Sequence, residues 1–539
     1  MDLSEEIINL PSSVAAYGWI PFVVAIVLSI LFSALYVKKF WYKSERDSCS
    51  AIIAIVGISF ALLSACLLPV DVFLVSFMKN SDGSFKDWAN NSTRQALEDS
   101  VSYTYYSLYG IVFFYTFFIL PLAYFSYEEK DDDHGSTFSV LTTALMYTVV
   151  FLVVITGLLL AGAFIPYKAP PMSNNSTEWN KIEFLVKELY KNRGKDAFSF
   201  VMNVLTVYGM LNIILYTSSG LASFPITLIK GFRSLSEEES VISRNQASTQ
   251  SKINDLRSKQ QTRKALSSRE IAALADLEEE ESLLSKRSAL LEYEKKSILN
   301  KCQPFFRIFH GICGCIGISF SLILFVSLLV TNIDKLMNSL GYHMGYILKQ
   351  NMLPNIMDYI MVEAQKVFPL DYILFFLIIL FLVICTISGM RFLGICCLCV
   401  PMYKVRPKKT PPQALLMLAF ILMFVVLAFN IFMYSVIPTY TTFGSQYYCK
   451  EVNGTCGLTA CSLDASADDC VMTRAGAFIL SFAYKAWIFA AAYYWLTWVF
   501  LIAFVFSFIH VLIRGRRSAL EEAIDKDDFD DSDDHMLSI

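Results

Sequence analysis

Nine long apolar runs constrain the fold of this chain more than any other feature of its sequence. The hydrocarbon core of a bilayer takes about 20 apolar residues per helical crossing, and each run reaches that length. One charged, helix-forming stretch, residues 230–301, interrupts the series. We therefore predict an all-α integral membrane protein of about nine transmembrane helices, with a cytoplasmic, coiled-coil-like helical arm between spans five and six. The predicted spans are 15–37, 51–78, 105–125, 138–165, 198–219, 311–330, 370–390, 414–437 and 485–513.

Composition agrees with a membrane protein. Hydrophobic residues make up 55% of the chain and charged residues only 17%, which lies outside the usual range of a soluble domain. The net charge of −4 comes from loops and tails and gives no basic face, so we exclude nucleic-acid binding.

The residues that flank the first run orient the chain. Acidic residues precede this run, whereas Lys38, Lys39, Lys43 and Arg46 follow it, so its carboxyl end should be cytoplasmic and the amino terminus lumenal. Nine crossings then place 79–104, 166–197, 332–369 and 438–484 in the lumen and the carboxyl terminus in the cytosol. The predicted organisation is 1–229 (spans one to five), 230–304 (arm), 305–513 (spans six to nine, with a disulfide-bearing lumenal loop at 438–484) and 514–539 (an acidic, disordered cytoplasmic tail).

Glycosylation sequons support this orientation, because glycans are added only on the lumenal face. Three clusters fall in three predicted lumenal segments. Their acceptors are Asn90, Asn91, Asn174, Asn175 and Asn453. Basic residues agree less completely, because the predicted cytoplasmic turn 127–135 has a single lysine while the lumenal segment 181–195 has several basic residues.

Four cysteines, Cys449, Cys456, Cys461 and Cys470, lie close together in the last predicted lumenal loop. In an oxidising compartment they predict two disulfides, with three possible pairings. A zinc site is the alternative, but the spacings match no common ligand pattern and the loop has no histidine.

The predicted arm carries a heptad pattern. Leu277, Leu284, Leu291 and Ile298 recur every seven residues and predict a narrow coiled-coil seam. A solvated helical hairpin with one apolar stripe is the simpler alternative to a docking helix. Glu279, Leu283 and Leu284 also have the spacing of an acidic-dileucine sorting signal, although the seam would cover the leucines.

Two Pro-x-Asp elements lie at the lumenal ends of spans. Asp371 follows Pro369 at the start of span seven, where a proline and an acid are ordinary features of a helix start. Asp71 lies several residues inside span two, where a charge costs about 3 kcal/mol and needs a wet cavity, a basic partner or another polar contact. We predict either a proton-linked or conformational role for Asp71 or a structural hydrogen bond.

Signatures of catalysis and energy coupling are missing from the sequence. It contains neither a Gly-x-x-x-x-Gly-Lys-Ser/Thr loop for nucleotide phosphates nor a His-Glu-x-x-His metal pair, and its five histidines share no ligand spacing. We expect no enzymatic activity and no metal site, so ATP-driven work would need a partner.

Several segments resemble the limb-region membrane protein family over nearly the whole chain. They are 68–78 (LPVDVFLVSFM), 85–90 (FKDWAN), 127–133 (YEEKDDD), 176–179 (STEW), 228–231 (LIKG), 368–374 (FPLDYIL) and 413–416 (QALL). The resemblance implies a nine-span lysosomal membrane glycoprotein that lets cobalamin leave the lysosome. It also implies escort of a half-size ABC transporter of the D subfamily from the endoplasmic reticulum to lysosomes, with cobalamin as cargo and no covalently bound cofactor.

Escort is the first of three functional hypotheses. In the second, the chain itself conducts cobalamin, coupled to the proton gradient through Asp71. In the third, it is an endocytic receptor or adaptor with a plasma-membrane pool, since related proteins bind lipocalins and the family is linked to clathrin-dependent uptake. A cytosolic cobalamin-processing protein, a clathrin adaptor and a second copy of the chain are further candidate partners.

Overall fold

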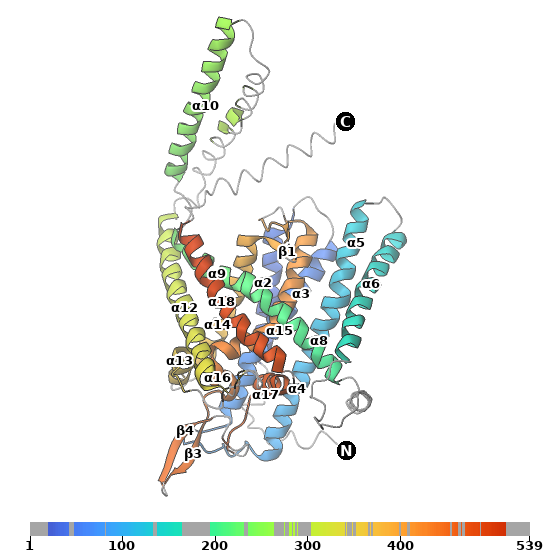
Figure 1. Cartoon of the computed structure of the whole chain (residues 1–539), viewed down its shortest axis with the longest axis vertical. Helices are drawn as coiled ribbons and strands as arrows, with labels where there is room; N and C mark the ends of the chain where they lie inside the picture. Colours follow the sequence, from blue (N-terminus) through green and yellow to red (C-terminus); the bar gives the residue numbers. More distant parts are fainter. Residues whose placement is uncertain are drawn as a thin grey trace, which may run out of the picture. The chain divides into compact units, whose positions relative to one another are not determined.

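The computed structural model describes most of the membrane-spanning sequence and part of what lies outside it (Figure 1). The described residues are 20–42, 48–80, 82–132, 137–163, 195–230, 235–263, 274, 277, 280–282, 284–285, 288, 303–339, 341, 346, 348, 352–364, 367, 370–397, 400–406, 410–452, 455–461, 465, 469–485 and 487–513.

Within this described part, nine helical spans are long and apolar enough to cross a membrane, which confirms the predicted all-α membrane fold. Seven are single helices: α2 (Ile20–Phe40), α3 (Ser48–Phe77), α6 (Thr137–Ala163), α12 (Gln303–Asn338), α14 (Leu370–Leu393), α15 (Pro412–Val436) and α18 (Trp487–Ile513). Two contain a π-helical turn: α4 (Asn91–Phe114) continues through η2 (Tyr115–Ile119) into α5 (Leu120–Asp132), and α8 (Lys195–Asn212) continues through η3 (Ile213–Thr217) into α9 (Ser218–Lys230).

Several helices extend beyond the predicted spans. The third begins at Asn91 instead of residue 105, and the sixth covers Gln303–Asn338 instead of 311–330. Polar turns at both ends remain helical because they pack against neighbouring elements or reach water, so an apolar window underestimates helix length.

Helix α15 forms the centre of the bundle and packs against α3, α5 and α8. It is apolar on all sides, as expected of a helix surrounded by other helices. Small residues bring the neighbours close, because a Cβ at Gly209 of α8 would lie 2.2 Å from the carbonyl oxygen of Phe424. Only glycine allows this approach.

A second close crossing joins α9 to α14. A Cβ at Gly220 would lie 1.7 Å from the carbonyl oxygen of Cys385, and one at Gly389 would lie 1.9 Å from that of Tyr216. The hydroxyls of Thr217 and Thr386 are hydrogen-bonded at 2.8 Å beside these glycines. The crossing lies at the end of the π-helical turn η3, so the backbone is irregular where the two helices come closest.

Short elements connect the spans. A two-stranded antiparallel hairpin, β1 (Ile395–Cys397) and β2 (Val400–Tyr403), follows α14. The helices α13 (Ile356–Ala364), α16 (Pro438–Phe443) and α17 (Arg474–Lys485) and the hairpin of β3 (Tyr447–Val452) and β4 (Thr455–Ala460) lie near the opposite end of the bundle (Figure 1). The sequence analysis predicted none of these elements.

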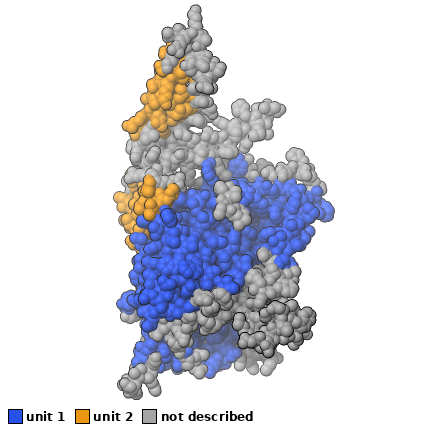
Figure 2. All heavy atoms as spheres, viewed as in Figure 1, with its two compact units in different colours: residues 1–223, 320–508 blue, residues 224–319, 509–539 orange. Residues whose placement is uncertain are grey.

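The chain divides into two compact units (Figure 2). The first comprises residues 1–223 and 320–508, and the second 224–319 and 509–539. The second unit contains α10 (Leu235–Arg263), whose Ile242, Thr249 and Ile253 are buried. Of the predicted seam, Leu284 is buried and Leu277 half-buried, while Leu291 and Ile298 lie outside the described residues.

Candidate functional site: a disulfide cap anchored by buried carboxylates

The segment 438–485, from α16 to α17, connects α15 to the last span and is called the disulfide cap below. Cys461 and Cys470 form a disulfide with 5.9 Å between their Cα atoms. Phe443, Tyr448 and Met472 pack against this bond. Cys449 is also disulfide-bonded, while the side chain of Cys456 lies outside the described part. The cap therefore has a small, cross-linked core of its own.

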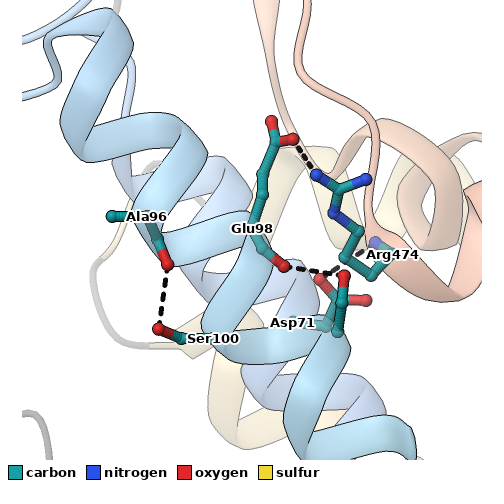
Figure 3. Close-up of polar contacts among 6 residues, drawn as sticks. Asp71, Ala96, Glu98, Ser100 and Arg474 are labelled. Carbon is teal, nitrogen blue, oxygen red and sulfur yellow. Dashed lines mark hydrogen bonds and ion pairs between the residues drawn. The ribbon is translucent and has the colours of Figure 1, made fainter. Parts of the chain in front are cut away.

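Asp71 anchors the second helix of the cap. It is 1% exposed, near the end of α3. Its Oδ1 accepts a hydrogen bond from the backbone N–H of Arg474 at 3.2 Å, and its Oδ2 accepts one from that of Ala475 at 2.8 Å. These are the first two residues of α17, whose N–H groups lack partners within the helix (Figure 3). The carboxylate thus caps the start of α17 from the membrane-spanning helix α3.

A second charged contact strengthens this junction. The guanidinium of Arg474 forms an ion pair with Glu98 of α4, next to Asp71 (Figure 3). Tyr105, also on α4 and fully buried, lies beside the Asp71 carboxylate. The first turn of α17 is therefore bound to both α3 and α4.

Asp358 of α13 holds the first helix of the cap in the same way. Its Oδ1 accepts from the N–H of Tyr440 at 2.9 Å and its Oδ2 from that of Thr439 at 3.3 Å, in the first turn of α16. Burial raises the pKa of Asp358 to about 6, although the two backbone hydrogen bonds act to lower it. Two buried carboxylates from different elements thus anchor the two cap helices.

Asn355 fixes the helix that carries Asp358. Its Oδ1 accepts from the N–H of Met357 at 2.9 Å, and its Nδ2 donates to Thr331 at 2.8 Å and to the carbonyl of Val436 at 3.0 Å. Asn355 therefore caps α13 and joins it to α12 and α15.

Asp371 lies in the first turn of α14, as the sequence predicts for a helix start. Its Oδ2 accepts a hydrogen bond from the hydroxyl of Tyr440 at 3.1 Å. Burial and this carboxylate raise the pKa of Tyr440 well above its ordinary value. The structure therefore adds a contact with the cap to the predicted helix-start role.

Lys79 and Gln446 fasten the loop between the two cap helices. The Lys79 ammonium donates to the carbonyl of Tyr447 at 2.9 Å and also to that of Asp469. Burial lowers the pKa of Lys79, with Asp469 acting in the opposite direction. Gln446 donates to the carbonyls of Phe443 and Val471 and accepts from the N–H of Val471, which closes the loop on itself.

The other candidate residues from the sequence lie apart from these anchors or outside the described part. Asn90 and Asn91 are exposed at the start of α4, a position that leaves them accessible. Asn174, Asn175, Asn453, Glu279 and Leu283 lie outside the described residues or have undescribed side chains. Leu284 is 4% exposed, so a sorting signal that includes it would require local unpacking. All of these assignments stay predictions.

The anchoring residues Asp358, Asn355, Lys79 and Gln446 escaped the sequence analysis. Each is a single polar residue in a segment that reads as a connecting loop. Asn355, three residues before Asp358 at the start of a short apolar stretch, carried a capping signal that could have been recognised. No pattern in the neighbouring sequence indicates their hydrogen-bond partners elsewhere in the chain.

The arrangement is suited to holding structure. The carboxylates bind backbone N–H groups, and among the described residues no three His, Cys, Asp or Glu side chains gather in a way that could hold a metal ion. The site joins α3, α4, α13 and α14 to one cross-linked cap. These features define a polytopic α-helical membrane protein whose last connecting segment binds several spans together.

Within that class, the chain belongs to the LMBR1-like membrane proteins, whose family profile matches residues 18–304. It is 40% identical to the "Probable lysosomal cobalamin transporter" of Nematostella vectensis, over 98% of this chain and 100% of the relative. It is 37% identical to the "Lysosomal cobalamin transport escort protein LMBD1" of Danio rerio (97% and 98%) and 38% identical to the protein of that name from Gallus gallus (96% and 97%). No solved structure gives a significant match.

Proposed function

We propose that this chain is a lysosomal membrane protein required for cobalamin export to the cytosol, acting as an escort of an ATP-driven transporter. The observation that carries the proposal is 37–40% identity, over nearly the full length, to proteins named for lysosomal cobalamin transport. Identity that extends over all nine spans and the cap supports a shared role for the whole chain.

The escort role rests on the absence of an energy source in the sequence. The chain has no phosphate-binding loop for ATP, so uphill transport needs a partner that has one. Half-size ABC transporters of the D subfamily are the partners that the family resemblance implies. Lateral packing of the chain's lipid-facing helices against the partner's spans is the natural mode of contact, because neither protein has to expose polar groups to lipid.

Direct conduction of cobalamin is the second candidate, and the word "transporter" in the name of the Nematostella relative favours it. In that scheme Asp71 would carry protons. Its geometry favours anchoring instead, because both carboxylate oxygens already accept hydrogen bonds from α17.

The proposed orientation places the amino terminus and the disulfide cap in the lysosomal lumen and the arm and carboxyl terminus in the cytosol. Disulfides form in oxidising compartments, and a cross-linked cap suits a lumenal location. The exposed Asn90 and Asn91 would then carry glycans acquired in the endoplasmic reticulum, before transit to lysosomes.

Reconstitution in liposomes tests the proposal. The purified chain is incorporated alone, with the candidate ABC partner, and with a partner that cannot hydrolyse ATP, and cobalamin flux is measured with and without a pH gradient. We expect flux only when the chain and the active partner are present together, and association of the two on a native gel. Flux through the chain alone would replace escort with conduction, and normal lysosomal cobalamin export in cells lacking the chain would refute both.

A further inference from the structure

An apolar pocket lies among α5, α6 and α15, away from the disulfide cap. Its volume is about 220 Å³. Its walls are formed by Leu120, Pro121, Tyr124, Phe125, Phe151, Leu416, Met417 and Phe420. The hydroxyl of Tyr124 is the one polar side-chain group in this set, and it is already hydrogen-bonded to that of Tyr403 at 3.1 Å.

The depth of the pocket along its helices places it among lipid chains. Leu120 and Phe125 lie ten and five residues before Lys130, where the third candidate span ends, which corresponds to about 15 and 8 Å along a helix. On α15, Leu416 and Phe420 lie one to two turns after the first residue of that span. All eight lining residues belong to helices that are long and apolar enough to cross a membrane, so the pocket lies beside the hydrocarbon of the bilayer.

We infer that this pocket binds part of an acyl chain of a membrane phospholipid. An apolar wall inside the bilayer offers no hydrogen bond to a polar ligand, and filling the space with hydrocarbon restores the van der Waals contacts that an empty pocket lacks. The four aromatic side chains and Met417 give the pocket an irregular shape that a flexible chain can follow.

The volume limits what the pocket can enclose. Drug-sized molecules occupy pockets of about 300–1,000 Å³, so a space of about 220 Å³ cannot enclose a corrinoid. A partner helix, with a diameter of about 10–12 Å including side chains, would cover the opening without entering it. A flexible hydrocarbon chain can place part of its length in the pocket and leave the rest among the surrounding lipids.

The backbone is also irregular where the pocket lies. The π-helical turn η2 ends at Ile119, and Pro121 follows two residues later in the pocket wall. Proline has no backbone N–H donor, so the helical hydrogen-bond pattern is interrupted again at this point. Single π-helical turns often occur at binding sites, which makes the same element the place to expect a ligand.

Photo-crosslinking tests the inference. The full chain is placed in nanodiscs that contain phosphatidylcholine with a diazirine in one acyl chain, irradiated, and mapped by peptide mass spectrometry. We expect crosslinks enriched at 120–125, Phe151 and 416–420. Met417→Trp fills the pocket from α15 and should lower this labelling about tenfold, equivalent to about 1.4 kcal/mol of binding free energy. Phe125→Trp, from α5, should act in the same direction.

Val149→Trp is the control, because it introduces the same tryptophan side chain at a 47% exposed position on α6 that does not line the pocket. It should leave pocket labelling unchanged. Size-exclusion chromatography in detergent confirms that each variant is folded before labelling. Equal labelling of wild type and both filled variants, or labelling spread along α6 in proportion to exposure, would overturn the inference.

Discussion

The two hydrogen bonds from α17 to Asp71 predict that this carboxylate keeps the disulfide cap closed. Asp71→Ala removes both acceptors and leaves the N–H groups of Arg474 and Ala475 unpaired in a buried place. A hydrogen bond to a charged group contributes about 1.5–3 kcal/mol, so the two together predict a loss of about 3–6 kcal/mol. Asp71→Asn keeps one acceptor oxygen and should lose about half, roughly 1.5–3 kcal/mol.

Hydrogen–deuterium exchange of the purified protein in nanodiscs measures this loss locally. For Asp71→Asn, a change of about 1.5–3 kcal/mol in the free energy of opening corresponds to about 12- to 150-fold faster exchange of the Ala475 amide. Asp87→Asn, which neutralises an exposed carboxylate close to α4, should leave the rate unchanged. Heating should show the same order of stability, with Asp71→Ala lowest.

Unchanged exchange at Ala475 in Asp71→Ala would show that the capping argument is wrong. A different result would support the other hypothesis for this residue. If Asp71→Asn exchanges like the wild type but abolishes pH-dependent cobalamin flux, then Asp71 acts by carrying a proton.

Three further predictions follow from other contacts. Burial raises the pKa of Asp358 to about 6, above the 3.8 of a free carboxyl, so the folded state binds this proton more tightly than the unfolded state. Lowering the pH from 7.5 to 5 should therefore stabilise the protein by about 1 kcal/mol. Thermal unfolding at the two pH values measures this gain, and Asp358→Asn should abolish it. Gly220→Ala places a methyl group 1.7 Å from the carbonyl oxygen of Cys385 and should cost at least about 3 kcal/mol of stability or prevent the helices from packing. Size-exclusion profiles measure this effect, with Gly110→Ala as the control, because its Cβ meets nothing within 4 Å. Cys461→Ser and Cys470→Ser break the same disulfide, so each should cost about 2–3 kcal/mol of stability and speed proteolysis of the cap. Digestion of both variants at the wild-type rate would show that the disulfide does not stabilise the cap. Cys315→Ser, at an exposed free thiol, is the control.

The spans could be predicted because membrane insertion depends on a local property, the apolar length of a segment. The start of α14 was equally local, since Pro369 and Asp371 are adjacent to the helix that they begin. Asp71 shows where this reasoning ends. A carboxylate in an apolar run requires a polar partner. That partner lies 403 residues away, and no local pattern in the sequence indicates the pairing.

The cap hairpin and the π-helical turns were missed for related reasons. β3 and β4 are each only six residues long, and the cysteines suggested cross-links without suggesting strands. The turn at η3 is accompanied by a glycine-to-glycine crossing that only the assembled bundle creates. Features that arise from tertiary contact have no periodic pattern to detect.

The separation of Asp71 from its partners also has a consequence for biosynthesis. At about 5–20 residues per second, a ribosome needs about 20–80 s after making α3 to produce residue 475. Throughout that interval the nascent chain holds a carboxylate inside the membrane with neither of its native donors. Any product truncated before α17 keeps it so permanently, and the unpaired carboxylate is then a chemical mark of an unfinished molecule.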